Sequence, residues 1–358
     1  MTYMDEFEEE RGDKQSGHRL AAAGILGALA VCAVSAVCAI LPLHHPSFAC
    51  GMAPLVTAGA VAIVLARLKN KYRCTATRAR AVSDTVRRVL LRPLPSRIGA
   101  LGIASVYRPC GGRGEVGGDL YAVARTGGAT RLIIGDVCGK GLHTFDDVAA
   151  VLGAFREWAP RAATLTELSV RLEESFLRHL AEAEDGDRDK DERFVTALLL
   201  EVPDGERHVR MVNRGHPPPV RAHRGSVALV SCCSSPPLGL HGLQDLGADE
   251  ECFELAAGDA LLLYTDGLIE ARDPSGHCYP LLDRATAWNW IRQDTARHQT
   301  LPDALSEILQ DLVDHAGALP EDDLAMVALT RLDKTDAAAL PRPAGQAGRE
   351  GEGQLQKD

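Results

Sequence analysis

The chain has 358 residues, of which 46% are hydrophobic and 25% are charged, and its formal net charge is −10 at pH 7. This length allows one or two domains, and the composition is that of a globular protein rather than a disordered or collagen-like one. The negative charge opposes non-specific nucleic-acid binding, which needs a basic surface to displace counterions from phosphates, so we expect no nucleic-acid partner.

Two long uncharged stretches follow an acidic N-terminus. Residues 1–19 contain six acidic and three basic side chains, and neither 20–43 nor 46–66 contains a charged residue. Each stretch is long enough for a helix that crosses a hydrocarbon core of about 30 Å. A signal peptide, which needs a basic start and a shorter apolar region, fits less well, as does a buried core hairpin. We predict two transmembrane helices within 20–66, behind an acidic cytoplasmic N-terminus.

Basic residues behind the second apolar stretch orient this hairpin. Residues 67–92 carry nine basic side chains and one acidic one, whereas the connection between the two stretches has no Lys or Arg. Because basic residues resist translocation, we expect both termini to be cytoplasmic and the protein to lie in the cell membrane. Residues 67–97 are predicted to form a basic juxtamembrane helix or linker, in contact with the lipid bilayer. Close packing of the Ala- and Gly-rich helices supports the further hypothesis of a homodimer.

Residues 98–332 have the pattern of a folded α+β domain. Strands are expected at 103–107, 120–124, 131–136, 195–202, 208–212, 228–230, 260–264 and 324–329. Helices are expected at 142–158, 165–183, 281–293 and 302–315. Many strands with few crossover helices predict stacked antiparallel sheets with helices on their outer faces. The charged stretch 183–193 is predicted to be a loop, and the polar residues 333–358 a disordered tail.

Acidic residues beside glycine or another carboxylate stand at four predicted strand ends or tight turns. They are Asp119, Asp136, Asp266 and the pair Asp322-Asp323. Singly, each has a plain explanation as a turn or a helix cap. Together, without a Cys-x-x-Cys pair or histidines at metal-binding spacing, they predict an oxygen-rich site suited to Mg²⁺ or Mn²⁺. Without a cation, converging carboxylates would repel one another and shift toward protonation.

Six motifs give this part of the chain a resemblance to a known family. In order they are GGDLY, GDVCGKGL, RFVTALLLEV, NRGHPPPV, LLLYTDGLIEA and EDDLAMVAL. Their order and spacing resemble the SpoIIE-like branch of PPM-type, protein-phosphatase-2C-like serine/threonine phosphatases, over roughly residues 98–332. The resemblance implies a four-layer α-β-β-α sandwich, with two antiparallel sheets flanked by helix pairs, here behind the transmembrane hairpin.

The resemblance also implies roles for individual residues. Asp136 would bridge two divalent cations, Mn²⁺ or Mg²⁺, with the Val137 carbonyl close by. Asp119 would bind one ion, and Asp266 and Asp322 would hold the other, with Asp323 as the alternative to Asp322. Two ions of this kind activate a water that attacks phosphorus directly.

The activity implied is that of a membrane-anchored protein phosphatase acting on phosphoserine and phosphothreonine. The partner would be a phosphorylated protein in bacterial signalling, for example an anti-sigma-factor antagonist. A membrane-tethered pseudophosphatase that binds a phosphoprotein without turnover is the alternative, and a cyclic-dinucleotide cyclase is a weaker one, because GGDLY lacks the Glu-Phe of that family's loop. Arg214 replaces a residue that is usually small, and His216 is interpreted as structural.

Overall fold

The structure is a computed structural model. It describes residues 63–70, 85–109, 117–139, 142–182, 193–223, 225–240, 248–286, 300–318 and 322–332. The chain divides into two compact units, Met1–Arg80 and Ala81–Asp358, and both sheets belong to the second.

Several predicted segments lie outside the described residues. They are the acidic N-terminus 1–19, the first span 20–43, most of the charged loop, 183–192, and the tail 333–358. Of the second predicted span, 46–66, only residues 63–66 are described, within a helical segment, 63–70. Among the residues that are described, no helix combines the length and the apolar character needed to cross a bilayer.

The first sheet is antiparallel, and its described strands follow the order β1-β2-β12-β11-β7-β8. Their bounds are β1 Arg97–Ile98, β2 Leu101–Arg108, β12 Leu324–Arg331, β11 Ala260–Tyr264, β7 Val220–His223 and β8 Ser226–Leu229. The C-terminal strand β12 therefore lies between the first long strand and β11, so that both ends of the domain's sequence meet in the middle of one sheet.

The second sheet has the order β10-β6-β5-β4-β3, and the short β9 pairs in parallel with β6. Its bounds are β10 Glu250–Glu254, β6 His208–Arg214, β5 Val195–Pro203, β4 Ala129–Val137, β3 Leu120–Arg125 and β9 Ser234–Ser235. All the other pairs in it are antiparallel. Hairpins join β3 to β4 and β5 to β6, whereas the connection from β4 to β5 contains two helices.

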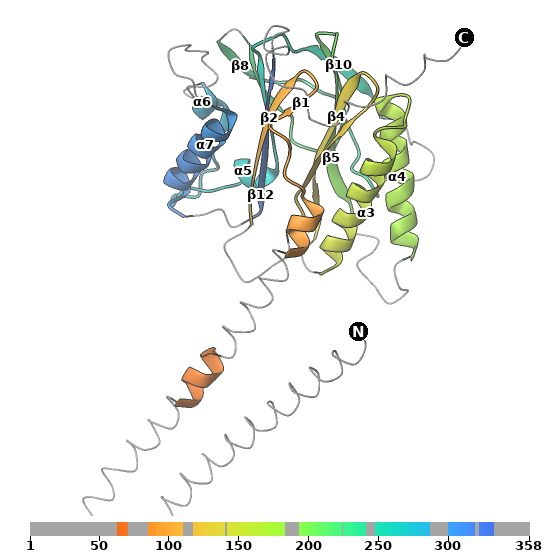
Figure 1. Cartoon of the computed structure of the whole chain (residues 1–358). Coiled ribbons are helices and arrows are strands. Elements are labelled where there is room, and N and C mark those ends of the chain that lie inside the picture. Colours follow the sequence, from red (N-terminus) through yellow and green to blue (C-terminus); the bar gives the residue numbers. More distant parts are fainter. Residues whose placement is uncertain are drawn as a thin grey trace, which may run out of the picture. The chain divides into compact units, whose positions relative to one another are not determined.

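Helices cover the outer faces of both sheets. The second sheet carries α3 Leu142–Trp158 and α4 Leu165–Glu182, while α5 Asp266–Ile269, α6 Leu281–Ala285 and α7 Leu301–Ala316 pack on the first. Figure 1 shows these two groups of helices on opposite sides of the strands. The predicted mixed α+β fold with stacked antiparallel sheets is confirmed.

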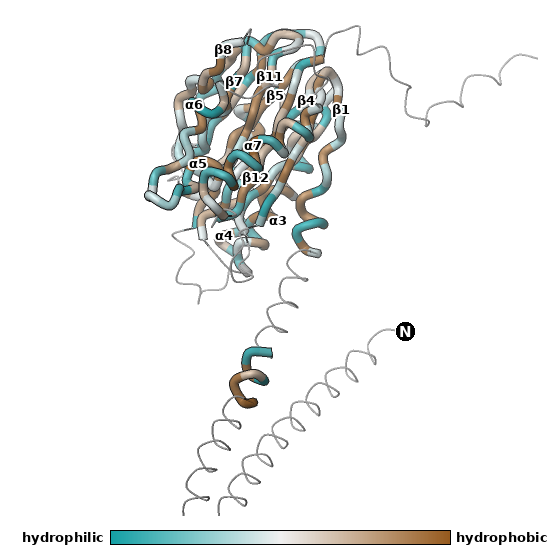
Figure 2. The backbone as a smooth tube through the Cα atoms, turned by 90° about the vertical axis from the view of Figure 1, so that its left-hand side faces the viewer, coloured by the Kyte–Doolittle hydropathy of each residue, from teal (hydrophilic) through white to brown (hydrophobic). Residues whose placement is uncertain are grey.

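The strand β11 shows how the layers share their side chains. Leu261 and Leu263 join the core cluster that contains residues of the second sheet, while Leu262 joins the cluster that contains Ile308 of α7. All five residues of β11 are buried, because the sheet is covered on both faces. This explains why the strand is a continuous apolar run rather than an alternating one. Figure 2 shows the hydrophobic residues gathered in the central strands.

Local signals set the limits of α7. Thr300 and Asp303 form a reciprocal capping box at its N-terminus, and Gly317 ends it in the left-handed region at φ 69°, with its N–H donating to the Val313 carbonyl. Both devices satisfy backbone groups that the helix leaves unpaired. The observed helix therefore extends one residue beyond the predicted helix, 302–315, at each end.

Elsewhere the boundaries differ from those expected. The predicted helix 281–293 begins as α6, which ends at Ala285, and residues 287–293 lie outside the described part. The strand β10 was not predicted, because three of its five residues are glutamates on an exposed edge. Residues 85–90, within the segment 67–97 predicted as a juxtamembrane helix or linker, are helical as expected, but Leu91 after them is buried in the core of the second unit.

Candidate metal centre

Two of the predicted aspartates come from neighbouring strands of the second sheet. The antiparallel register of β3 and β4 pairs Leu120 with Gly135. One step further along the same register, Asp119 before β3 faces Asp136 near the end of β4. Residues separated by a hairpin in the sequence are thus brought opposite each other.

The remaining aspartates come from the central strands of the first sheet. Asp266 is the first residue of α5, directly after β11, and Asp322 and Asp323 directly precede β12. Since β11 and β12 pair with Tyr264 opposite Met326, the end of one strand lies beside the start of the other. All five carboxylates therefore stand at strand ends, as the sequence predicts.

Thr265 connects the aspartates of the second sheet to those of the first. Its fully buried hydroxyl donates to Oδ2 of Asp119 at 2.8 Å and accepts from the backbone N–H of Ala325 at 2.9 Å. The first contact connects the second sheet to the first. We call the set Asp119, Asp136, Asp266, Asp322 and Asp323 the acid cluster.

Three members of the acid cluster, Asp119, Asp136 and Asp266, have pKa values raised by burial and by neighbouring carboxylates. Burial, followed by the charge of Asp136, raises the pKa of Asp119 well above its usual range. Burial, followed by the charges of Asp266 and Asp322, raises the pKa of Asp136 to about 7. Burial also raises the pKa of Asp266, with Glu270 and Asp322 adding to the effect. Such mutual shifts mean that these carboxylates are close enough to repel one another.

Glycines allow the backbone segments of the site to approach closely. A Cβ atom on Gly118 would lie 2.5 Å from the Val137 carbonyl oxygen and 2.7 Å from Oδ1 of Asp136. Neither separation leaves room for a side chain, so the second glycine of GGDLY is required by packing at the site. The Val137 carbonyl accordingly lies beside the Asp119 segment, in the neighbourhood where the family resemblance expects it.

The two adjacent aspartates before β12 have different surroundings. Asp323 is buried and accepts a hydrogen bond from the Tyr107 hydroxyl at 2.5 Å, and its backbone N–H donates to Oδ1 of Asp322 at 2.9 Å. Asp322 contributes to the raised pKa values of Asp136 and Asp266, whereas Asp323 contributes to those of Asp119 and Asp136. The link to Asp266 makes Asp322 the candidate to share a cation with Asp266, with Asp323 as the alternative.

The donor set fits small divalent cations that keep part of their water shell. All the candidate ligands are carboxylate or carbonyl oxygens, which Mg²⁺ and Mn²⁺ prefer. Within the described part of the chain, no three His, Cys, Asp or Glu side chains gather closely enough to hold one ion by themselves. Mg²⁺ typically binds through one or two carboxylates and retains several waters, and such waters can bridge to a further carboxylate.

His216 and Arg214 lie behind the site. Burial lowers the pKa of His216 to about 3, so the ring is neutral. It accepts at Nδ1 from the Thr196 hydroxyl and donates from Nε2 to the Tyr264 carbonyl, each at 3.1 Å. Arg214, fully buried, pairs with Glu173 of α4 at 2.8 Å. These contacts agree with a structural role for His216 and explain the large residue at position 214.

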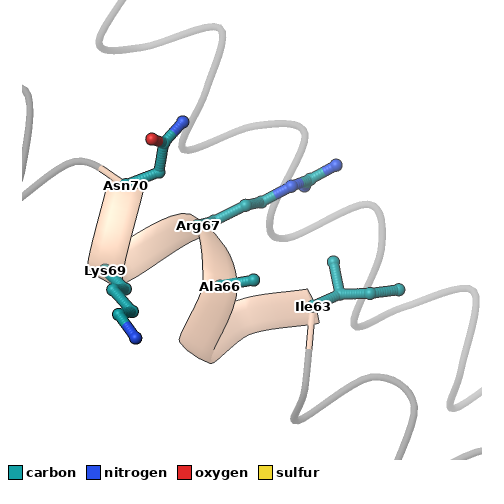
Figure 3. A pocket seen from close by; sticks show the side chains of 5 residues that line it. All are labelled: Ile63, Ala66, Arg67, Lys69 and Asn70. Atoms are coloured by element: carbon teal, nitrogen blue, oxygen red, sulfur yellow. The ribbon is translucent and has the colours of Figure 1, made fainter.

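A separate pocket occurs on the helical segment 63–70 of the first unit. It is lined by Ile63, Ala66, Arg67, Lys69 and Asn70, whose side chains Figure 3 shows around the helix. None of these residues is a carboxylate, and both of the charged ones are basic. The pocket therefore offers no carboxylate ligand for a divalent cation.

The predicted site residues are thus brought together, but two of their partners were missed. Thr265 and Tyr107 carry no local signal of their contacts, because Thr265 meets Asp119 across 146 residues and Tyr107 meets Asp323 across 216. In the sequence, a tyrosine near the end of a strand gives no sign of such a contact, because many half-buried tyrosines occur there.

Comparison with known proteins agrees with this architecture. A family model described as Stage II sporulation protein E (SpoIIE) matches residues 126–332, which is more than half of the chain and includes every member of the acid cluster except Asp119. No curated protein sequence matches the chain.

Three solved structures are similar in fold. The RsbU and RsbW domains of a Mycobacterium tuberculosis protein have 23% identity and a TM-score of 0.52, over 67% of this chain and 61% of that one. The SiaA-PP2C domain of Pseudomonas aeruginosa has 15% identity and a TM-score of 0.50, over 75% and 99%. A serine/threonine phosphatase of S. agalactiae has 14% identity and a TM-score of 0.50, over 65% and 100%. The chain thus spans about three fifths of the first of these structures.

Proposed function

The chain belongs to the SpoIIE family of PP2C-type, metal-dependent serine/threonine phosphatases, and from this premise we propose that it hydrolyses phosphoserine and phosphothreonine in proteins at the acid cluster. The observation that carries the proposal is the convergence of carboxylates from both sheets, joined by the Thr265–Asp119 contact, with the pKa values of Asp119, Asp136 and Asp266 raised by burial and by neighbouring carboxylates. Repulsion of this kind costs stability unless cations neutralise it, and a folded protein keeps such an arrangement where function requires it.

Two divalent cations, Mn²⁺ or Mg²⁺, would when bound neutralise the phosphate oxygens and lower the pKa of the attacking water. Asp136 has electrostatic contacts both with Asp119 and with the carboxylates of the first sheet. It is therefore suited to bridge the two cations. Asp119 would hold one ion, with the Val137 carbonyl nearby, and Asp266 and Asp322 would hold the other.

The remaining polar residues hold this arrangement in place. Thr265 restrains the Asp119 carboxylate through its hydroxyl, and neutral His216 restrains the strand that ends at Tyr264, directly before Thr265 and Asp266. Neither residue has to exchange a proton in these contacts. We therefore assign both to positioning and neither to proton transfer.

The first experiment is hydrolysis of p-nitrophenyl phosphate by the full chain, purified in detergent, with Mn²⁺ and then with EDTA. We expect activity with Mn²⁺ that EDTA and Asp136→Asn each abolish. The matched control is Asp283→Asn, which removes the charge of an exposed aspartate on α6 and should leave activity unchanged. Activity that survives EDTA would refute the mechanism, and Mn²⁺ binding without turnover of any phosphoprotein would favour the pseudophosphatase.

We further propose that the catalytic domain is tethered to the cytoplasmic side of the cell membrane by helices within 20–66. The support is the length of the two uncharged stretches and the nine basic residues in 67–92. Fractionation of cells that express the full chain tests the anchor, and protease digestion of inverted vesicles tests the orientation. Recovery of the full chain in the cytosolic fraction would contradict it.

A phosphorylated regulatory protein, such as an anti-sigma-factor antagonist, is the proposed substrate. The support is the family together with the similarity to RsbU and RsbW domains, although the latter shows only the fold. Phosphoproteomics of cells carrying Asp266→Asn, compared with wild type, would identify it as a protein whose serine or threonine phosphorylation rises. An unchanged phosphoproteome would argue against this role.

A further inference from the structure

The Tyr107–Asp323 contact involves the one member of the acid cluster to which no cation is assigned above. Tyr107 is the penultimate residue of β2, and its hydroxyl donates to Oδ2 of Asp323 at 2.5 Å. Asp323 is only 3% exposed. A hydrogen bond from a hydroxyl to a buried carboxylate is among the stronger ones in proteins, so this contact restrains the orientation of the Asp323 side chain.

Asp323 is also confined by two glycines of the motifs that supply the other ligands. A Cβ atom on Gly117 would lie 0.9 Å from Oδ2 of Asp323, and one on Gly267 would lie 1.9 Å from its carbonyl oxygen. Gly117 precedes Asp119 by two residues, and Gly267 directly follows Asp266. The segments that carry Asp119 and Asp266 therefore both pack against Asp323, at the start of β12.

The backbone of Asp323 connects this packing to Asp322, a proposed metal ligand. Its N–H donates to Oδ1 of Asp322 at 2.9 Å. The Tyr107 hydrogen bond and the close approach of Gly117 and Gly267 hold Asp323 from its side chain and from its carbonyl. They therefore also restrain the backbone N–H that orients the Asp322 carboxylate. Hydrogen bonds of this kind, one shell outside the metal, commonly tune affinity about 10–100-fold.

The ring of Tyr107 is held from its other side. The guanidinium of Arg87 lies over it, 4.9 Å from the ring centroid, a geometry in which a cation is attracted to the aromatic face. Arg87 belongs to the helical residues 85–90, drawn in orange beside α3 in Figure 1. That segment is fixed to the domain by the burial of Leu91 and by a hydrogen bond from Arg156 of α3 to the Leu90 carbonyl.

We propose that Tyr107 is a positioning residue of the metal centre. Its hydroxyl fixes Asp323, Asp323 orients Asp322 for the cation shared with Asp266, and Arg87 keeps the tyrosine ring in place. The inference rests on the proposed function, because it assigns a role toward cations that the acid cluster would bind.

The test is Mn²⁺ binding to the full chain, measured by isothermal titration calorimetry in detergent, for wild type and Tyr107→Phe. Phenylalanine keeps the ring beneath Arg87 and removes only the hydroxyl. We expect two Mn²⁺ ions in wild type and a loss of affinity of about tenfold or more for one of them in the variant. Because the loss is one of affinity, added Mn²⁺ should restore phosphatase activity.

Tyr279→Phe is the matched control. Tyr279 also donates to a carboxylate, that of Asp311 on α7, outside the acid cluster, so its loss reports the general cost of removing a tyrosine–aspartate bond. We expect that variant to bind Mn²⁺ as wild type does. Asp323→Asn should retain affinity within about threefold, because its amide oxygen still accepts from Tyr107, and Arg87→Gln should weaken binding less than Tyr107→Phe does.

The outcomes separate this inference from the proposed function. Wild-type affinity in Tyr107→Phe, or equal losses in Tyr107→Phe and Tyr279→Phe, would overturn the positioning role alone. A loss of Mn²⁺ binding in Asp323→Asn as large as that in Asp266→Asn would also overturn it, because Asp323 would then be a ligand itself. A wild-type chain that binds no Mn²⁺ would overturn the proposed function and the inference together.

Discussion

The buried acids of the acid cluster and the buried acids elsewhere in the domain differ in what surrounds them. Away from the cluster, Glu173 accepts from Arg214, Asp147 accepts from Arg193 and Glu201 accepts from Arg131. Each of these contacts gives a desolvated carboxylate a cationic partner, as burial demands. At the acid cluster, the charges that raise the pKa of Asp136 are those of other carboxylates, Asp266, Asp322 and Asp323.

A half-exposed acid shows the effect of a cationic partner on pKa. Hydrogen bonding to Arg125 lowers the pKa of Asp204, whereas burial and neighbouring carboxylates raise the pKa of Asp136. The fold supplies its own cations where an acid serves packing. At the acid cluster, we infer that the cations come from solution.

The largest expected effect, on activity and metal binding, follows removal of a proposed metal ligand. Asp266→Asn should reduce phosphatase activity on the order of a thousandfold, more than the about 10–100-fold typical of residues one shell further out. It should also remove high-affinity Mn²⁺ binding, measured by calorimetry. The metal-free variant should melt no lower than metal-free wild type, because one repulsive charge is gone. A clear drop in its melting temperature would mean that Asp266 is a packing residue, like the paired acids.

The second effect is on a paired acid. Glu173→Gln should lower the free energy of unfolding by about 3–5 kcal/mol, because it leaves the charge of fully buried Arg214 without its carboxylate. Urea denaturation measures this loss. The folded fraction should bind Mn²⁺ with wild-type affinity, since Glu173 is outside the acid cluster. Altered Mn²⁺ affinity would show that the two kinds of acid are not independent.

The third effect is a pH dependence of the metal-free protein. The pKa of Asp136 is raised from its ordinary value of 3.8 to about 7, so between these values the folded state holds more protons than the unfolded state. Stability therefore falls as pH rises through this range and continues to fall until Asp136 is charged. From pH 6.5 to 8 we expect the melting temperature in EDTA to decrease by a few degrees.

That window is chosen because His216 acts in the opposite direction below it. Its pKa is lowered to about 3, so protonation of the unfolded state reduces stability only below the ordinary value of about 6.5. Asp136→Asn should flatten the decrease, and saturating Mn²⁺ should remove it. A melting temperature that rises from pH 6.5 to 8 in EDTA would contradict the mutual repulsion.

The smallest effect belongs to a half-exposed pair. Arg125 contacts Asp204 through two hydrogen bonds of 2.8 and 2.6 Å, with both side chains 36% exposed. Solvent screens such a pair, so Arg125→Ala should cost no more than about 1 kcal/mol of unfolding free energy and leave activity intact. A cost as large as that of Glu173→Gln would mean that burial is not what separates strong pairs from weak ones.

Much of the fold could be read from local patterns. The helix 142–158 and the strand 260–264 were predicted with the bounds that the structure has, because a long helical periodicity and a fully apolar run are unambiguous. The edge strand β10 and the short β7 were missed, since an edge strand with three glutamates lacks the apolar signal. The strand order, with β12 between β2 and β11, follows from pairings that no local pattern encodes.

The same division applies to the site. The sequence by itself determined which carboxylates stand at strand ends beside glycines, because turn chemistry and apolar runs are local properties, and the order of its motifs determined the family. Only the tertiary structure decided that Tyr107 bonds Asp323 and that Thr265 joins the two sheets. Both contacts connect residues more than a hundred positions apart, and they arise only when distant strands pair and the two sheets pack together.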